Sequence, residues 1–211
     1  MDYEKRAMNK ITMIDYGGSN LRSAQKAFEF VGADLVTTAD PDVIGRAVKL
    51  VLPGVGAFGA GMDAVRALEL VEPIHEAVQR GIPMLGICIG MQFLFEDSNE
   101  MGQHEGLGLI PGHVVRFPGN GLKVPHMGWN QLEHDGSHFL LKGVEPGAYT
   151  YFVHSYHCVP ADPAWIVAST EYGRPFCAIV ARDNVYGIQF HPEKSHKIGL
   201  RIIQNFVEAV L

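Results

Sequence analysis

Three side chains have types and spacings that could support nucleophilic catalysis, and the first is Cys88. It is the centre of the pentapeptide GICIG (residues 86–90), where an apolar run changes into a helical pattern. A G-x-C-x-G sequence at a strand-to-helix junction predicts a nucleophile elbow, a tight turn that exposes the central side chain. The positive end of the helix that follows favours a thiolate over a thiol. A buried cysteine between glycines that serve helix–strand packing is the alternative.

A cysteine nucleophile needs a base, and the segment FHPEK indicates His191 with Glu193. His191 ends a β-pattern, and Pro192 prevents that strand from continuing normally. Glu193 follows at the spacing that returns an extended chain to the same face. A carboxylate there could orient the imidazole and stabilise its protonated form. On its own, H-P-E is also compatible with an exposed loop and a proline turn.

Acyl chemistry also requires hydrogen-bond donors for an oxyanion, and the glycine-rich segment LPGVGAFGAG (52–61) could supply them. We expect the donors to be backbone amides of Val55 and Gly56, together with Ile89, which follows the nucleophile. A phosphate-binding loop is the alternative for such a segment. We rank it lower because the G-K-[ST] sequence of a P-loop is missing.

Composition limits the class of protein. The 211 residues carry a net charge of −6 without a basic run, which argues against nucleic-acid binding. The cysteines, Cys88, Cys158 and Cys177, fit neither a disulfide framework nor a CxxC metal site, so we expect a reduced, cytoplasmic protein with Cys158 and Cys177 in the core. We expect no leader and no membrane span. His154 and His157 lack partners at ligand spacing, so we expect no metal.

The first half of the chain alternates between strand and helix patterns. Strands are predicted for ITMIDY (11–16), DLVTTA (34–39), KLVLPG (49–54) and PMLGIC (83–88). Asn20 could cap a helix that Gly32 ends, and a second helix is predicted over 62–81 with a break near Pro73. MQFLFEDS (91–98) has a helical pattern. This alternation is typical of a doubly wound α/β sheet.

The second half, from about Gly106, is rich in short β-segments separated by turns, and it ends in an amphipathic helix over 195–211. The apolar stripe of that helix contains Leu200, Ile203, Val207 and Val210. We therefore predict a single α/β domain over residues 1–211 with a mixed central sheet and helices on both faces. Residues 1–10 form an extension before the first strand.

Motifs over nearly the whole chain resemble those of the triad-type (class I) glutamine amidotransferases: PGVGAF, GICIGMQ, MGWN, YFVHSY and FHPEKS. The forms PGVGAF, MGWN and HPEKS are similar to one branch of that family, the glutaminase subunits of histidine biosynthesis. Ile89 stands where leucine is expected, and neither this nor the N-terminal extension touches the chemistry. The resemblance implies the three-layer, flavodoxin-like fold of the family.

The resemblance also implies an activity. Cys88 would attack the side-chain amide of glutamine, with His191 relaying protons, and would release glutamate and ammonia. The ammonia would pass to a cyclase subunit with a (β/α)8 barrel fold, in a heterodimer that makes imidazole glycerol phosphate and aminoimidazole carboxamide ribotide. No cofactor is implied. Glutamine would be held by Gly56, by Gln92, one helical turn past Cys88, and by the backbone of Ser155 and Tyr156.

The same motifs imply a partner interface at Trp129, Asn130, Tyr151 and Lys194. For Trp129, packing on its own domain is the alternative, and for Tyr151 it is an ordinary strand position.

Three other functions are compatible with parts of the pattern. One is a class I amidotransferase for pyridoxal phosphate, guanylate or anthranilate synthesis, with the same chemistry and another acceptor. The second is a cysteine hydrolase or peptidase that acts alone. The third is a scaffold subunit with a vestigial triad, which the intact set of Cys88, His191 and Glu193 disfavours.

Overall fold

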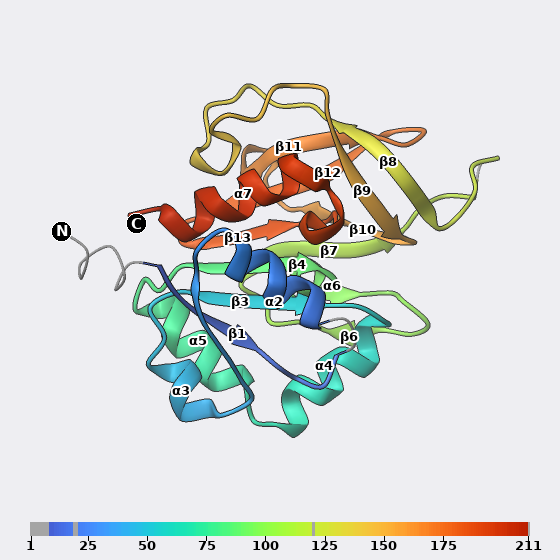
Figure 1. The fold of residues 1–211 in the computed structure, drawn as a ribbon. Helices are drawn as coiled ribbons and strands as arrows, with labels where there is room; N and C mark the ends of the chain where they lie inside the picture. The colour runs from blue at the N-terminus through green and yellow to red at the C-terminus, as the bar shows by residue number, and fades with distance from the viewer. Residues whose placement is uncertain (1–8, 19–20, 120, 211) are drawn as a thin grey trace.

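A seven-stranded mixed sheet forms the centre of the computed structural model, which describes residues 9–18, 21–119 and 121–210 (Figure 1). Its strand order is β11-β12-β13-β4-β3-β1-β2. The strands are β1 (Lys10–Ile14), β2 (Asp34–Thr38), β3 (Leu50–Gly54), β4 (Met84–Cys88), β11 (Ile166–Glu171), β12 (Pro175–Arg182) and β13 (Val185–Ile188). β12 pairs antiparallel with β11 and β13, whereas the other pairs are parallel. The predicted mixed central sheet is confirmed.

Helices cover both faces of this sheet. α2 (Leu21–Phe30) and α7 (His196–Glu208) lie on one face, and α3 (Pro41–Gly45), α4 (Phe58–Ala67) and α5 (Val71–Gln79) lie on the other (Figure 1). Successive strand residues alternate between the two cores: Val51 packs on the α2–α7 side, while Leu50 and Leu52 pack on the opposite side. The predicted three-layer architecture is confirmed.

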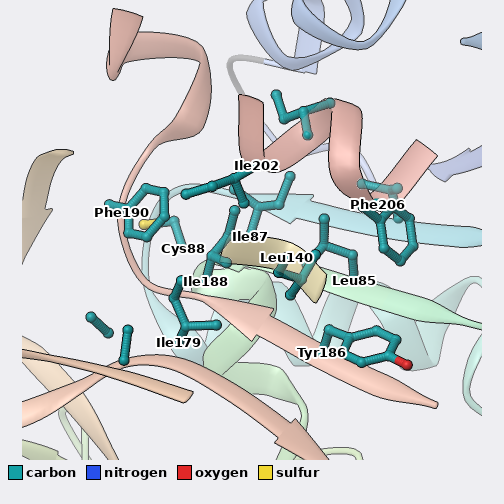
Figure 2. Close-up of a cluster of buried hydrophobic side chains, with 14 of the residues drawn as sticks. Leu85, Ile87, Cys88, Leu140, Ile179, Tyr186, Ile188, Phe190, Ile202 and Phe206 are labelled. Carbon is teal, nitrogen blue, oxygen red and sulfur yellow. The ribbon is translucent and has the colours of Figure 1, made fainter. Parts of the chain in front are cut away.

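The core beneath α7 reaches the end of β4. Ile202 and Phe206 of α7 pack over strand residues that include Leu85 and Ile188, and Cys88 lies at the edge of this cluster (Figure 2). The side chain of Cys88 is therefore backed by a tightly packed apolar layer.

Two smaller sheets extend the molecule beyond the central sheet. One has the order β10-β7-β5-β6, and the other is the hairpin β8–β9. Their strands are β5 (Phe95–Ser98), β6 (His104–Glu105), β7 (Ile110–Arg116), β8 (His126–Leu132), β9 (Ala148–His154) and β10 (Tyr156–Pro160). The short elements are α6 (Ile89–Phe93), η1 (Phe139–Leu141), η2 (Pro163–Trp165) and η3 (Pro192–Lys194). The sequence indicated strands here but not their division into separate sheets.

Two helix predictions need correction. The helix expected over 91–98 ends at Phe93, and Phe95 begins a strand instead, because β5 is paired on both sides, with β6 and β7. The break expected near Pro73 lies at Glu69, whose φ is 55°. Pro73 sits in the first turn of α5, where its missing N–H group costs nothing.

The C-terminal helix is present, but its buried stripe differs from the predicted one. The buried residues are Gly199, Ile202, Ile203, Phe206 and Val207. Val210 lies beyond the end of α7 and is 78% exposed, because the helix ends at Glu208. The predicted cap at Asn20 and most of the N-terminal extension lie outside the described residues; Lys10, expected in the extension, already belongs to β1.

Candidate active site

Cys88 occupies a sharp turn between β4 and α6. Its φ and ψ angles are 56° and −113°, in a region that residues with a side chain rarely adopt. The helix begins at the next residue, Ile89, so the whole change of direction from strand to helix falls on Cys88. Such strain at a non-glycine residue persists only where the surroundings enforce it and is concentrated at functional sites. The predicted elbow is present.

The glycines on either side of Cys88 are required by close backbone contacts. A Cβ atom on Gly86 would lie 2.5 Å from the carbonyl oxygen of Gly90. A Cβ atom on Gly90 would lie 1.8 Å from the carbonyl oxygen of Leu52. Both distances are far below van der Waals contact, so the elbow can form only with glycine at these positions.

His191 and Glu193 follow β13, which pairs with β4 in parallel, with Ile188 opposite Ile87. The two strands therefore end at the same edge of the sheet, where His191 meets Cys88. His191 Nδ1 lies 2.9 Å from Glu193 Oε1. The side chains of His191 and Glu193 are only 3% and 6% exposed. The contact matches the prediction, but its cause differs, because residues 192–194 form the 3₁₀ turn η3 and not an extended strand.

The charged form of His191 is stabilised by its two neighbours. Burial alone would lower the pKa of this imidazole. Hydrogen bonds with Cys88 and Glu193, together with the charges of these two groups, outweigh burial and raise the His191 pKa above its ordinary value. An imidazole held between a thiol and a carboxylate can accept the thiol proton and later return it to a leaving group.

The candidate oxyanion residues gather around Cys88. β3 lies beside β4 with Gly54 opposite Cys88, so the loop that follows β3 begins next to the sulfur. Val55, Gly56 and Ile89 line the same cavity as Cys88. Gly56 has a φ of 107°, which glycine adopts easily, and a Cβ on Gly54 would lie 2.4 Å from Ile89 Cγ2.

A cavity of about 320 Å³ opens at Cys88, within the size range of small-molecule sites. Every residue that the sequence indicated for glutamine lies in its wall. The lining residues are Val55, Gly56, Cys88, Ile89, Gln92, Glu100, Pro125, Val153, His154, Ser155, Tyr156 and His191.

Gln92 is buried and fixed by the protein. Its Nε2 atom donates to the carbonyl oxygen of Tyr156 at 3.0 Å and to Gln189 Oε1 at 3.1 Å. Both amide hydrogens are thereby engaged, so Gln92 can offer a substrate only its carbonyl oxygen.

The sequence reasoning missed Glu100 and His154 as cavity residues. Glu100 Oε2 accepts a hydrogen bond of 2.7 Å from the amide of Phe58, at the start of α4. Its carboxylate has the charge needed to pair with an ammonium group in the cavity. The acidic character of Glu100, twelve residues after Cys88, is the sequence signal for its place in the cavity, whereas no pattern in the sequence indicates that His154 lines it.

Two of the four predicted interface residues, Trp129 and Tyr151, lie on the outer face of the β8–β9 hairpin, and Lys194 of η3 lies beside Tyr151. Trp129 is 46% exposed, and its ring stacks on His196 at 5.0 Å and contacts the edge of Tyr151 at 5.8 Å. Lys194 Nζ lies 5.8 Å from the centre of the Tyr151 ring. Met127 is also exposed on this face. The tryptophan therefore packs partly on its own domain and still leaves part of its ring exposed.

Asn130, the fourth predicted interface residue, points inward. Alternation along β8 puts it on the face of His126, and its Nδ2 atom contacts His126 Nε2 at 3.2 Å and the carbonyl oxygen of Glu171 at 2.8 Å.

The other cysteines are core residues, as expected. Cys158 and Cys177 are 1% and 2% exposed and unpaired, and burial raises the pKa of each thiol. In the part of the chain that the structure describes, no helix is long and apolar enough to cross a membrane.

Comparison with known proteins yields a family and a set of curated relatives. The family model described as Glutamine amidotransferase class-I matches residues 12–210. The chain is 54% identical to imidazole glycerol phosphate synthase subunit HisH of Syntrophotalea carbinolica over 202 residues, covering 93% of this chain and 98% of that protein. It is 53% identical to the HisH subunit of Geobacter sulfurreducens, covering 95% and 99% of the two chains.

Solved structures agree with the fold. A crystal structure titled as a glutamine amidotransferase has a TM-score of 0.74 at 16% identity, covering 95% of this chain and 99% of that one. The structure of PurLQS from Thermotoga maritima has a TM-score of 0.72 at 22% identity, covering 93% and 96%. At this identity the likeness concerns the fold alone.

Proposed function

The chain belongs to the class-I glutamine amidotransferases, and on that basis we propose that Cys88, His191 and Glu193 are the catalytic triad of a glutaminase. The protein is the glutaminase subunit of an imidazole glycerol phosphate synthase and acts in histidine biosynthesis. The observation that carries this function is the roughly half-identical sequence of HisH subunits along more than nine-tenths of the chain. The alternatives left open by the motifs, another amidotransferase branch, a solitary hydrolase or a scaffold, lack such support.

In the proposed reaction, the Cys88 sulfur attacks the side-chain amide carbon of glutamine and forms a tetrahedral intermediate. Backbone amides of Val55, Gly56 and Ile89 stabilise the negative charge on its oxygen. His191 gives a proton to the amide nitrogen, the C–N bond breaks and ammonia leaves. Water, deprotonated by His191, then cleaves the glutamyl thioester to glutamate and restores Cys88. Glu193 keeps the imidazole oriented throughout.

The substrate fits the cavity chemically. The carbonyl oxygen of Gln92 and the backbone of Ser155 and Tyr156 would hold polar groups of glutamine, beside Gly56. We propose that Glu100 pairs with the α-ammonium group, because its carboxylate belongs to the same wall. Glu100→Gln should then raise the KM for glutamine and leave kcat nearly unchanged.

We propose that the acceptor of ammonia is a cyclase subunit of (β/α)8 barrel fold, docked in a heterodimer on the outer face of the β8–β9 hairpin. Trp129, Tyr151 and Lys194 supply aromatic area and a positive charge there, a composition favoured at protein interfaces. Because the thiol of Cys88 must stay reduced, we assign the protein to the cytoplasm.

The loop of Gly54, Val55 and Gly56 offers a means of control by the partner. Glycine makes alternative orientations of these amides accessible, and the loss of one oxyanion donor costs about 10²–10³ in kcat. Steady-state glutaminase rates, measured with and without the cyclase, test both the control by the loop and the identity of the partner. The complex, loaded with the nucleotide ligand of the cyclase, should be at least about a hundredfold faster than the isolated chain. Equal rates would show that the loop is already competent alone.

A further inference from the structure

Two buried histidines join the β8–β9 hairpin to the wall of the candidate glutamine cavity. His154 Nδ1 lies 2.8 Å from the carbonyl oxygen of Tyr156. His154 Nε2 lies 3.1 Å from His126 Nδ1, and His126 Nε2 lies 3.2 Å from Asn130 Nδ2. The chain of contacts thus runs from Asn130 on β8 to the backbone of Tyr156.

The end points determine where each proton lies. A carbonyl oxygen can only accept, so His154 must carry its proton on Nδ1 and present Nε2 as an acceptor. His126 must then donate from Nδ1 to that nitrogen, which leaves its own Nε2 as an acceptor. Asn130 Nδ2 donates to it with one hydrogen and to the carbonyl oxygen of Glu171 with the other. Every donor meets an acceptor, and all point the same way.

Both rings are neutral in this arrangement, and their surroundings favour that state. His126 lies between the rings of Phe152 and Tyr172, with centroid distances of 5.0 and 4.1 Å. Burial lowers the pKa of His126 to about 4 and that of His154 to about 3. A proton on either ring at neutral pH would place a charge in an aromatic layer and oppose the direction of the chain.

We propose that His154 and His126 are positioning residues for glutamine, acting through a one-way chain of hydrogen bonds that fixes the carbonyl group of Tyr156. The proposal rests on the proposed function, since it names residues that shape the same cavity. The hydrogen-bonding nitrogens of His154 are both engaged by the protein, so the residue acts on the substrate through Tyr156 and not by direct hydrogen bonding.

The carbonyl group of Tyr156 is the point where the hydrogen-bond chain meets Gln92, one of the residues proposed to bind glutamine. It accepts from His154 Nδ1 at 2.8 Å and from Gln92 Nε2 at 3.0 Å, so both of its lone pairs are used. Loss of the His154 bond would free this peptide group and, with it, the Gln92 side chain. Glutamine binding should weaken more than the chemical step, because Cys88 lies at the end of β4 and His191 and Glu193 lie at η3, outside the hydrogen-bond chain.

Two substitutions of similar polarity separate a specific hydrogen bond from simple packing. In His154→Asn, the side-chain amide nitrogen takes the place of Nδ1 and can still donate to Tyr156. In His154→Gln, the amide reaches the place of Nε2, and the donor to Tyr156 is lost although more of the ring volume is filled. We expect His154→Gln to raise the KM for glutamine roughly tenfold, the effect of one lost hydrogen bond, with kcat within about threefold of the native value.

His154→Asn should raise KM at least about threefold less than His154→Gln. Equal KM values, or a milder effect of the glutamine variant, would overturn the assignment. Thermal unfolding of both variants reports whether either fails to fold, and in that case the native protein decides the question alone.

The decisive readout on the native protein is the side-chain ¹⁵N spectrum of the histidines at pH 7, with signals assigned by His126→Asn and His154→Asn. We expect both rings to be neutral with the proton on Nδ1. A proton on Nε2, or an imidazolium ion, at either residue would overturn the chain. This spectrum needs no activity, so an absence of glutaminase activity in the native complex would refute the proposed function and leave the hydrogen-bond chain to be judged separately.

Discussion

His191 and Glu193 are joined by a contact of 2.9 Å between Nδ1 and Oε1, made within the single turn of η3. Pro192 forms the start of this turn and is buried, so the carboxylate is carried by the same rigid segment as the imidazole. With both side chains almost inaccessible to solvent, the pair is held in one geometry. The imidazole and the carboxylate that orients it are therefore positioned together, by local structure.

This arrangement predicts a graded loss of activity within the proposed triad. His191→Ala removes the group that moves protons and should lower kcat by about 10²–10⁴ or more. Glu193→Gln keeps the shape and an acceptor for Nδ1–H but removes the charge, so it should be the milder change. Measured kcat values of the two variants in the complex decide the order. A lower kcat for Glu193→Gln than for His191→Ala would contradict the assigned roles.

The elbow predicts a steric limit at Gly90. Gly90→Ala should lower the free energy of unfolding by about 3 kcal/mol or more, because its Cβ would overlap the carbonyl oxygen of Leu52. Gly45→Ala is the matched control, since a Cβ there meets nothing within 4 Å. Urea unfolding of both variants gives the comparison. Equal stability of the two would mean that the elbow is not as tightly packed as described.

The residues of the elbow were predictable from sequence because they carry the contacts themselves. The pattern GICIG indicates both the reactive side chain and the two positions where the backbone approaches closely. HPE likewise indicated the contact of His191 with Glu193, although through the wrong geometry. An extended strand and a 3₁₀ turn both bring these side chains together, and the spacing alone does not distinguish them.

Other features depend on contacts between distant segments, which a local pattern does not reveal. Residues 95–98 have a helical pattern but form β5, because β6 and β7 pair with them. The inward direction of Asn130 follows from the register of β8 with β9, which the motif MGWN does not specify. Glu100 lies in the cavity wall because the fold brings it next to segments that are distant in the sequence.

A stability prediction concerns Lys49, which is 4% exposed and immediately precedes β3. Its ammonium group donates to the carbonyl oxygens of Phe206, Val207 and Ala209 at the end of α7, the latter at 2.8 Å. The last carbonyl groups of a helix have no N–H partner within that helix, and a positive charge is favourable beside them. Lys49→Met should therefore cost about 1–3 kcal/mol of unfolding free energy.

The matched control for Lys49→Met is Lys10→Met, at an exposed position of the neighbouring strand β1. Chemical denaturation should leave this control close to the native stability. If the Lys49 variant is as stable as the control, the lysine does not act as a cap of α7.

Three buried histidines, His126, His154 and His157, predict that the fold is destabilised by acid. Burial lowers the pKa of His126 to about 4, of His154 to about 3 and of His157 to about 4, with Arg174 close to His157. These groups are neutral in the folded state but take up protons in the unfolded state below about pH 6.5. The unfolded state then binds more protons, so stability falls as the pH falls.

Each of these histidines contributes a slope of up to roughly 1.4 kcal/mol per pH unit between about pH 6.5 and its folded pKa. His191 does not add to this loss, because its raised pKa means that it is already protonated in the folded state. Unfolding free energies at pH 7, 6 and 5 measure the effect. A value that stays constant over this range would contradict the neutral, buried state of the three rings.

The most direct test of the central claim uses Cys88→Ala in the complex with the cyclase. In the proposed function, the Cys88 thiol serves only to release ammonia from glutamine, and the proposed cyclase partner carries out the synthesis. Formation of imidazole glycerol phosphate from glutamine should fall at least about a thousandfold, whereas formation from added ammonium salt should stay at the native rate. Product formed from glutamine at the normal rate by the Cys88→Ala complex would contradict the account.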